Sequence, residues 1–203
     1  MSTGTALAEA LGVSYAAGIN VPATVAILGI AEREGWIGQL PAGLSVVGEW
    51  WIIALAGGIY LVEFLIALVP GLASVWETFQ SIIRPPAAAV LAAATVYHLD
   101  PKLLVPAALL GGGLAITTYG AKLGLRYAVD ASPEPVTNAI ANFAELATIA
   151  SIGISIWHHP YLTLSLALLL LVLLILLVRR VIRAVRRVFS SGWREASDPG
   201  GAA

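Results

Sequence analysis

The chain contains no cysteine among its 203 residues. Disulfides, thiolate nucleophiles and sulfur-ligated metals therefore have no part in its fold or chemistry. Charge is scarce as well: Asp, Glu, Lys and Arg make up 11% of the residues, whereas a soluble domain carries about 25%. Charged groups are too few to cover a water-soluble surface of this size.

Apolar residues take the place of the missing charges. They account for 59% of the chain, and the mean hydropathy is +0.88. A chain of this length cannot hide so much apolar surface inside one globular core. The composition therefore predicts an all-α, polytopic membrane protein.

Six apolar stretches approach the length of about 20 residues that a membrane-crossing helix requires. They cover residues 6–31, 50–69, 82–97, 103–125, 136–156 and 162–178. We expect six crossings, and the first stretch, which Gly18 and Pro22 interrupt, is a candidate for a broken or re-entrant element. Residues 1–188 would form one transmembrane helical bundle, followed by a short flexible tail at 189–203.

Basic residues gather after the last apolar stretch, at Arg179, Arg180, Arg183, Arg186 and Arg187. Because positive charge marks the cytoplasmic side, the C-terminus is predicted to be cytoplasmic, and an even number of crossings places the N-terminus there too. These arginines are expected to contact anionic lipid headgroups. Nucleic acid is not an expected partner.

An internal repeat is suggested when the chain is shifted by 59 positions. The shift pairs Tyr60 with Tyr119 and Pro101 with Pro160. Residues 50–108 and 109–167 would then be two copies of a helical hairpin, an arrangement that is common among transporters.

Several polar residues fall inside the predicted crossings, where they are costly and usually face a partner or a hydrated cavity. They are Glu63, Arg84, Lys122, Arg126, Asn138, Asn142 and Glu145. The last three share one helix face at spacings of four and seven residues. We expect the charged residues to form a buried, mutually compensating cluster in the cytoplasmic half, so that Glu145→Ala destabilises the fold more than Glu9→Ala. Such a cluster would either join helices or line an ion pathway.

Motifs of known enzyme classes are missing from the sequence. There is no nucleophile elbow, phosphate-binding loop, dinucleotide fingerprint or zinc-protease motif. His98, His158 and His159 have no carboxylate at metal-ligand spacing. We expect no enzyme activity, no cofactor and no metal site.

Several short runs together resemble one membrane family. They lie at residues 17–20, 60–64, 69–71, 74–77, 83–85, 120–122, 125–126 and 131–136. Over residues 12–160 the chain resembles the family known as domain of unknown function 4126. The resemblance implies a bacterial inner-membrane protein and supplies no activity. The family carries an acidic–basic pair where this chain has Ala67 and Leu68, and often an acidic residue where it has Ala73.

Two functions stay open at this point. One is a small transporter or channel for an ion or small solute, with its polar residues around a central pathway. The other is a structural or assembly subunit, packed as a homo-oligomer or within a larger membrane complex through residues 162–178. A transporter should converge its polar residues on one interior cavity, whereas a structural subunit can scatter them among separate helix contacts.

Overall fold

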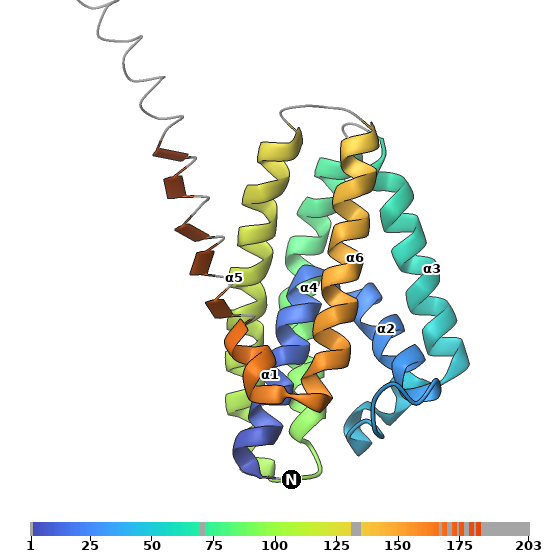
Figure 1. Cartoon of the computed structure of the whole chain (residues 1–203), viewed down its shortest axis with the longest axis vertical. Helices are drawn as coiled ribbons and strands as arrows, with labels where there is room; N and C mark the ends of the chain where they lie inside the picture. The colour runs from blue at the N-terminus through green and yellow to red at the C-terminus, as the bar shows by residue number, and fades with distance from the viewer. Residues whose placement is uncertain are drawn as a thin grey trace, which may run out of the picture.

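The computed structural model describes residues 2–69, 72–130 and 135–166, together with residues 168, 169, 172, 173, 175, 176, 179, 180, 182 and 183. Every regular element within these residues is helical (Figure 1). The α-helices are α1 (Thr3–Ile19), α2 (Val21–Arg33), α3 (Trp50–Ala67), α4 (Leu72–Val96), α5 (Leu104–Asp130) and α6 (Pro135–His158), with 3₁₀ turns η1 (Ala42–Gly48) and η2 (Pro101–Leu103).

Four segments are long and apolar enough to cross a membrane. They are Trp50–Ala67, Val75–Val96, Pro101–Gly124 and Asn138–His158. Large apolar side chains on their outer faces are exposed, among them Ile82 at 73% and Leu109 at 72%. Such a surface suits lipid and not water. The prediction of a helical, membrane-type fold is confirmed for the described residues.

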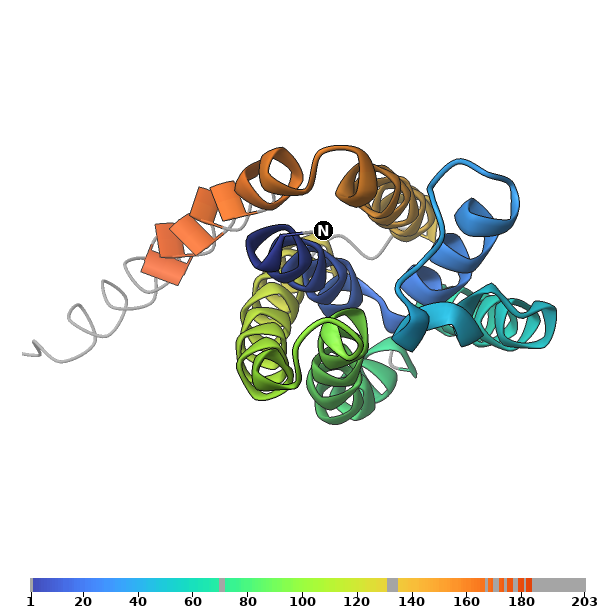
Figure 2. The same ribbon diagram turned by 90° about the horizontal axis from the view of Figure 1, so that it is seen from below.

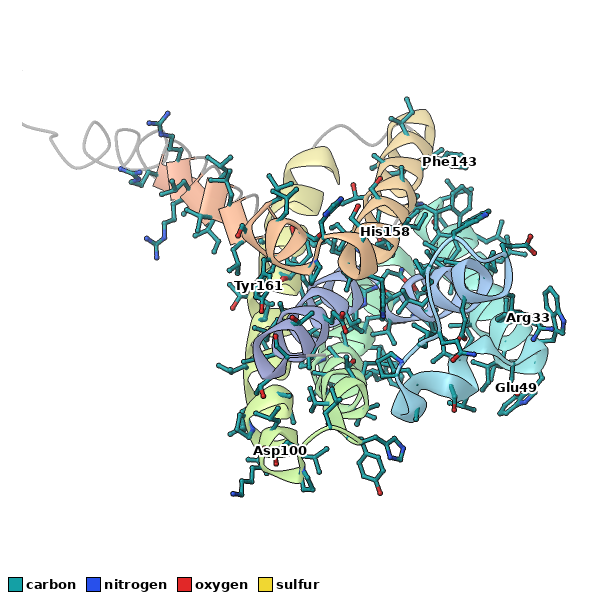
Figure 3. The ribbon with its side chains drawn as sticks, turned by 60° about the horizontal axis from the view of Figure 1, so that its bottom comes forward. Arg33, Glu49, Asp100, Phe143, His158 and Tyr161 are labelled. Carbon is teal, nitrogen blue, oxygen red and sulfur yellow. The ribbon has the colours of Figure 1, made fainter. Side chains whose placement is uncertain are left out.

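The first apolar stretch does not form one helix of crossing length. It forms two helices of 17 and 13 residues, each shorter than the roughly 20 residues that a crossing requires. The Thr5 hydroxyl lies 3.3 Å from that of Tyr161, and a ring nitrogen of His158 lies 2.9 Å from the Trp36 carbonyl oxygen. His158 and Tyr161 are neighbours at the end of α6 (Figure 3), so the start of α1 and the end of α2 lie at the same end of the bundle.

The hairpin of α1 and α2 therefore enters the bundle and turns back (Figure 1). The prediction that residues 6–31 cross once is wrong, and a re-entrant element fits instead. Two predicted crossings, at 6–31 and 50–69, would place the N-terminus at the same end of the bundle as the turn after residue 69, and this prediction is also wrong. The N-terminus lies at the opposite end from that turn (Figure 1), where Thr5 of α1 contacts Tyr161.

Asn20 separates the two helices of the hairpin. Its backbone is extended, with φ −159° and ψ 114°, and its side-chain oxygen accepts a hydrogen bond of 2.9 Å from the Ala23 N–H. Asparagine is a favoured N-cap residue, and proline is tolerated in the first turn of a helix but not in its interior. Pro22, which lies in the first turn of α2, therefore fixes the break.

Small residues allow α1 to lie deep between the crossing helices, with α4, α5 and α6 around it (Figure 2). Ala17, Ala88 and Ala115 form a fully buried contact. A Cβ atom added to Gly18 would lie 2.9 Å from the Ala115 Cα. Membrane helices approach closely through such residues. Ala17 and Gly18 are the residues through which α1 makes this close approach.

Gly18→Ala is expected to destabilise the protein by about 1–3 kcal/mol, the usual cost of overpacking. The added methyl group would press on the backbone of Ala115 and on the Thr118 Cβ, neither of which is the far end of a flexible side chain. Thermal unfolding in detergent measures the loss.

Gly113→Ala is the matched control, because a Cβ there meets nothing within 4 Å. It should be neutral, or stabilise α5 by up to about 1 kcal/mol through helix propensity. Equal melting temperatures for the two variants would contradict the packing argument.

Helical turns resume at residues 160–166, and the described turns among residues 168–183 extend away from the bundle (Figures 1 and 2). The predicted crossing at 162–178 is therefore described only in part. Arg179, Arg180 and Arg183 are exposed, whereas Arg186, Arg187 and the predicted tail at 189–203 lie outside the described residues. The 59-residue repeat stays a prediction.

The absence of native cysteine makes the re-entrant topology directly testable. Single cysteines at Ser2, Gln39 and Asp100 should react with a membrane-impermeant maleimide from one side of the membrane. A cysteine at Val69 should react from the other side. Labelling of Ser2 and Val69 from the same side would show that the first segment crosses after all.

Candidate functional site

Charged side chains from all four crossing helices meet at the tip of the α1–α2 hairpin. α3 contributes Glu63, α4 contributes Glu77 and Arg84, α5 contributes Lys122 and α6 contributes Glu145. We call these five residues the charge cluster. Arg84 is only 1% exposed and Glu63 only 6%, so ion pairing must offset the large cost of taking these charges out of water.

Arg84 and Lys122 are the two described cations of the charge cluster. Arg84 Nη2 lies 3.7 Å from Glu63 Oε2 and Nη1 lies 3.5 Å from Glu77 Oε2. The guanidinium carbon also sits 4.8 Å from the centre of the Tyr119 ring. Lys122 Nζ lies 2.7 Å from Glu145 Oε1 and 3.9 Å from Glu77 Oε1. Glu77 thus links the two cations.

The hairpin tip is bound to the charge cluster from both of its helices. Asn20 Nδ2 donates to Glu63 Oε2 at 2.6 Å and to Glu145 Oε1 at 3.2 Å. Lys122 Nζ donates to the Ile19 carbonyl oxygen at 3.0 Å. An ammonium therefore meets the negative C-terminal end of α1, and two carboxylates lie at the positive N-terminal end of α2, as the helix dipoles favour.

A cavity of about 20 Å³ lies within the charge cluster. Its walls are formed by Asn20, Tyr60, Glu63, Phe64, Ile66, Ala67, Ala73, Trp76, Glu77, Arg84, Lys122, Asn142 and Glu145. Beside it, Phe64 and Phe143 join α3 to α6 in an edge-to-face contact with ring centres 5.4 Å apart (Figure 3). This volume is close to what one water molecule needs.

Three N–H groups of the cavity wall have no hydrogen-bond partner in the described part of the chain. They are Trp76 Nε1, Arg84 Nε and Asn142 Nδ2. Buried donors are nearly always paired. The cavity is therefore suited to a small group that accepts hydrogen bonds.

Five of the seven residues singled out in the sequence line this one cavity: Glu63, Arg84, Lys122, Asn142 and Glu145. Asn138, one turn before Asn142, is half-exposed and lies outside the cavity wall. The side chain of Arg126 lies outside the described residues.

The structure adds residues that the sequence did not single out. Glu77, Gln80 and Arg84 follow each other at spacings of three and four, which places them on one face of α4. Gln80 donates to Glu63 Oε1, and the Tyr119 hydroxyl lies 2.9 Å from Glu77 Oε2. The spacing of these α4 residues is visible in the sequence, but Glu77 and Gln80 precede the predicted crossing, which begins at residue 82.

A family model described as Domain of unknown function (DUF4126) matches residues 7–180. The chain belongs to this DUF4126 family. The match includes the hairpin from residue 7 onward, α3 to α6 and every member of the charge cluster. No curated protein and no solved structure matches the chain.

Two alanines form part of the cavity wall near the α3–α4 turn. Ala67 ends α3 and Ala73 lies in the first turn of α4, and both line the cavity. Neither side chain brings a polar group to the wall beside Glu63.

Proposed function

We propose that this DUF4126 protein transports an ion or small solute across a membrane, with the charge cluster as its binding site. The observation that carries the proposal is the meeting of a re-entrant hairpin tip with charges from four helices around one cavity. Secondary transporters place their sites near the middle of the bilayer, at helices that are broken in this way.

Convergence of the polar residues separates transport from the structural alternative. A subunit that used its charges as glue would have no need to bring five of them to a single cavity. The pairing of the charges and the small volume do favour a structural subunit of a larger complex or homo-oligomer. That role is therefore kept as the second candidate.

The cavity is closed to anything larger than about one water molecule, so transport on this proposal requires a second, open conformation. α2 is the element best placed to move. An apolar groove of about 550 Å³, lined by Val21, Val25, Ile82, Pro86 and Val90 among others, runs between α2 and α4. The groove leaves α2 unpacked on its α4 side, whereas α3 and α6 pack against other faces of α2. Opening on this proposal would therefore move α2 toward the groove.

The orientation that we propose follows from the basic residues. The arginines that follow the last apolar stretch would face the cytoplasm and contact anionic headgroups of a bacterial inner membrane. They are Arg179, Arg180, Arg183, Arg186 and Arg187. The C-terminus would then be cytoplasmic. Because the N-terminus lies at the end of the bundle with His158, we place it and His158 on the outer side.

Flux through purified protein in liposomes tests the proposal. Wild-type protein should move at least one small ion or solute, and Glu145→Gln should reduce the flux to background because it removes the carboxylate charge that pairs with Lys122. Asn138→Ala is the matched control on the same helix, and it should retain flux. An inert wild-type protein that copurifies with a membrane complex would favour the structural role.

A further inference from the structure

The donors around the cavity limit which ion can bind there. A metal cation is held by several oxygen ligands, and bare N–H donors repel it. Here the unpaired wall groups are the N–H donors of Trp76, Arg84 and Asn142. The site therefore lacks the chemistry of a sodium, potassium or calcium site.

Both carboxylate oxygens of Glu63, and Oε1 of Glu145, already have donors. Glu63 Oε2 accepts from Asn20 and pairs with Arg84, and its Oε1 accepts from Gln80. Glu145 Oε1 accepts from Asn20 and Lys122. A metal cation would have to displace these donors, whereas a proton needs one carboxylate oxygen and no coordination shell. One water in the cavity can accept from the wall donors and donate to a carboxylate.

A second buried carboxylate lies on α1, in the other half of the bundle. Glu9 is only 3% exposed, and its Oε2 has no hydrogen-bond partner in the described part of the chain. It precedes Asn20 by eleven residues, which is close to three full turns, so the two residues share one face of α1 about 16 Å apart. Val13 and Ala16, both fully buried, occupy the same face between them.

An isolated carboxylate at this depth is far cheaper to bury with its proton than without it. None of the ion pairs among the described residues includes Glu9. It is thus unsuited to binding a helix partner by charge and well suited to holding a proton. Because Glu9 is buried, it is not the exposed comparison for Glu145 that the sequence predicts, and Glu9→Ala can affect the fold as well.

We propose that the transported ion is the proton, that Glu63 and Glu145 exchange it at the hairpin tip, and that Glu9 carries it in the half of the bundle near the N-terminus. This inference rests on the proposed transport function. Each transfer breaks one O–H bond of a carboxylic acid and forms one on a carboxylate through intervening water, with no change of oxidation state. Five titratable neighbours face the exchange site: Arg84, Lys122, Glu77, Tyr60 and Tyr119. Val13 and Ala16 block the route in the closed structure.

Liposomes that contain a trapped pH dye test the inference, with valinomycin and potassium setting the membrane potential. Wild-type protein should acidify or alkalinise the lumen in response to the potential, and the rate should not change when sodium replaces choline or chloride replaces gluconate. Glu9→Gln should lower the proton flux roughly a hundredfold, the usual cost of losing a positioned proton-transfer group. Glu34→Gln, at an exposed position, should match wild type.

The outcomes separate the two proposals. Absence of flux for every ion would overturn both. Chloride or sodium flux without proton flux would leave transport standing and overturn the proton. Full proton flux in Glu9→Gln would overturn the role of Glu9. If that variant fails to fold, infrared spectroscopy of Glu63→Gln at neutral pH decides, because a protonated carboxyl band is expected there and its absence would overturn the role of Glu9.

Discussion

Arg84→Met is expected to lower the free energy of unfolding by about 3–5 kcal/mol, the usual cost of removing one partner of a buried ion pair. Arg84 lies between Glu63 and Glu77 and is 1% exposed. Methionine fills a similar volume, so the loss reports on charge and not on a cavity. Unfolding in a denaturing detergent, followed by circular dichroism, measures it.

Two further variants show whether the charge is the cause. Arg179→Met removes an exposed arginine and should leave stability within about 0.5 kcal/mol of wild type. Arg84→Met combined with Glu63→Gln should be more stable than the two single losses added together, because the residues interact directly. Additive losses would argue against the pair.

Asn20→Asp is expected to be more damaging than Asn20→Ala, although aspartate keeps the shape of asparagine and is an equally good helix cap. The substitution replaces the Nδ2 donor by an oxygen that faces Glu63 and Glu145. Alanine loses the cap and the two hydrogen bonds, whereas aspartate places a third carboxylate against two others. We expect a loss of about 3 kcal/mol or more for aspartate, the scale of an uncompensated buried charge, together with loss of flux.

The pH dependence of stability tests whether charge repulsion causes the loss in Asn20→Asp. Protonation removes the repulsion, so the variant should recover stability relative to wild type as the pH falls. Asn138→Asp, at a half-exposed position outside the cavity wall, should show no such recovery. If Asn20→Asp is as stable as wild type at neutral pH, the hairpin tip does not bind the two carboxylates.

The position of a charged residue deep inside an apolar stretch was enough to identify most of the site from the sequence. Glu63, Lys122 and Glu145 stand out because few charges occur in this chain, and a charge inside an apolar helix needs a partner. Glu77 and Gln80 were not predicted, because they do not lie inside an apolar stretch. Together with Thr78 they make the first turns of α4 polar enough to look like a loop, although Glu77 and Gln80 are buried.

The hairpin was harder to predict, because average hydropathy does not distinguish a helix that crosses from two shorter helices that turn back. The local signals were present in Asn20 and Pro22, which can end one helix and begin another. The turn is stabilised inside the bundle by Lys122 and Glu145, which are remote from it in sequence. Local patterns cannot reveal such contacts.

The order of synthesis gives the hairpin a further consequence. α1 and α2 leave the ribosome first, yet the partners of their tip come later: Glu63 follows Asn20 by 43 positions and Glu145 by 125, and Lys122 follows Ile19 by 103. Until α6 has been made, the polar tip has no complete set of partners at membrane depth, where unpaired groups are costly. The hairpin can therefore reach its final position only after the other four helices have been made. Until then it would stay at the membrane surface or beside the insertion machinery.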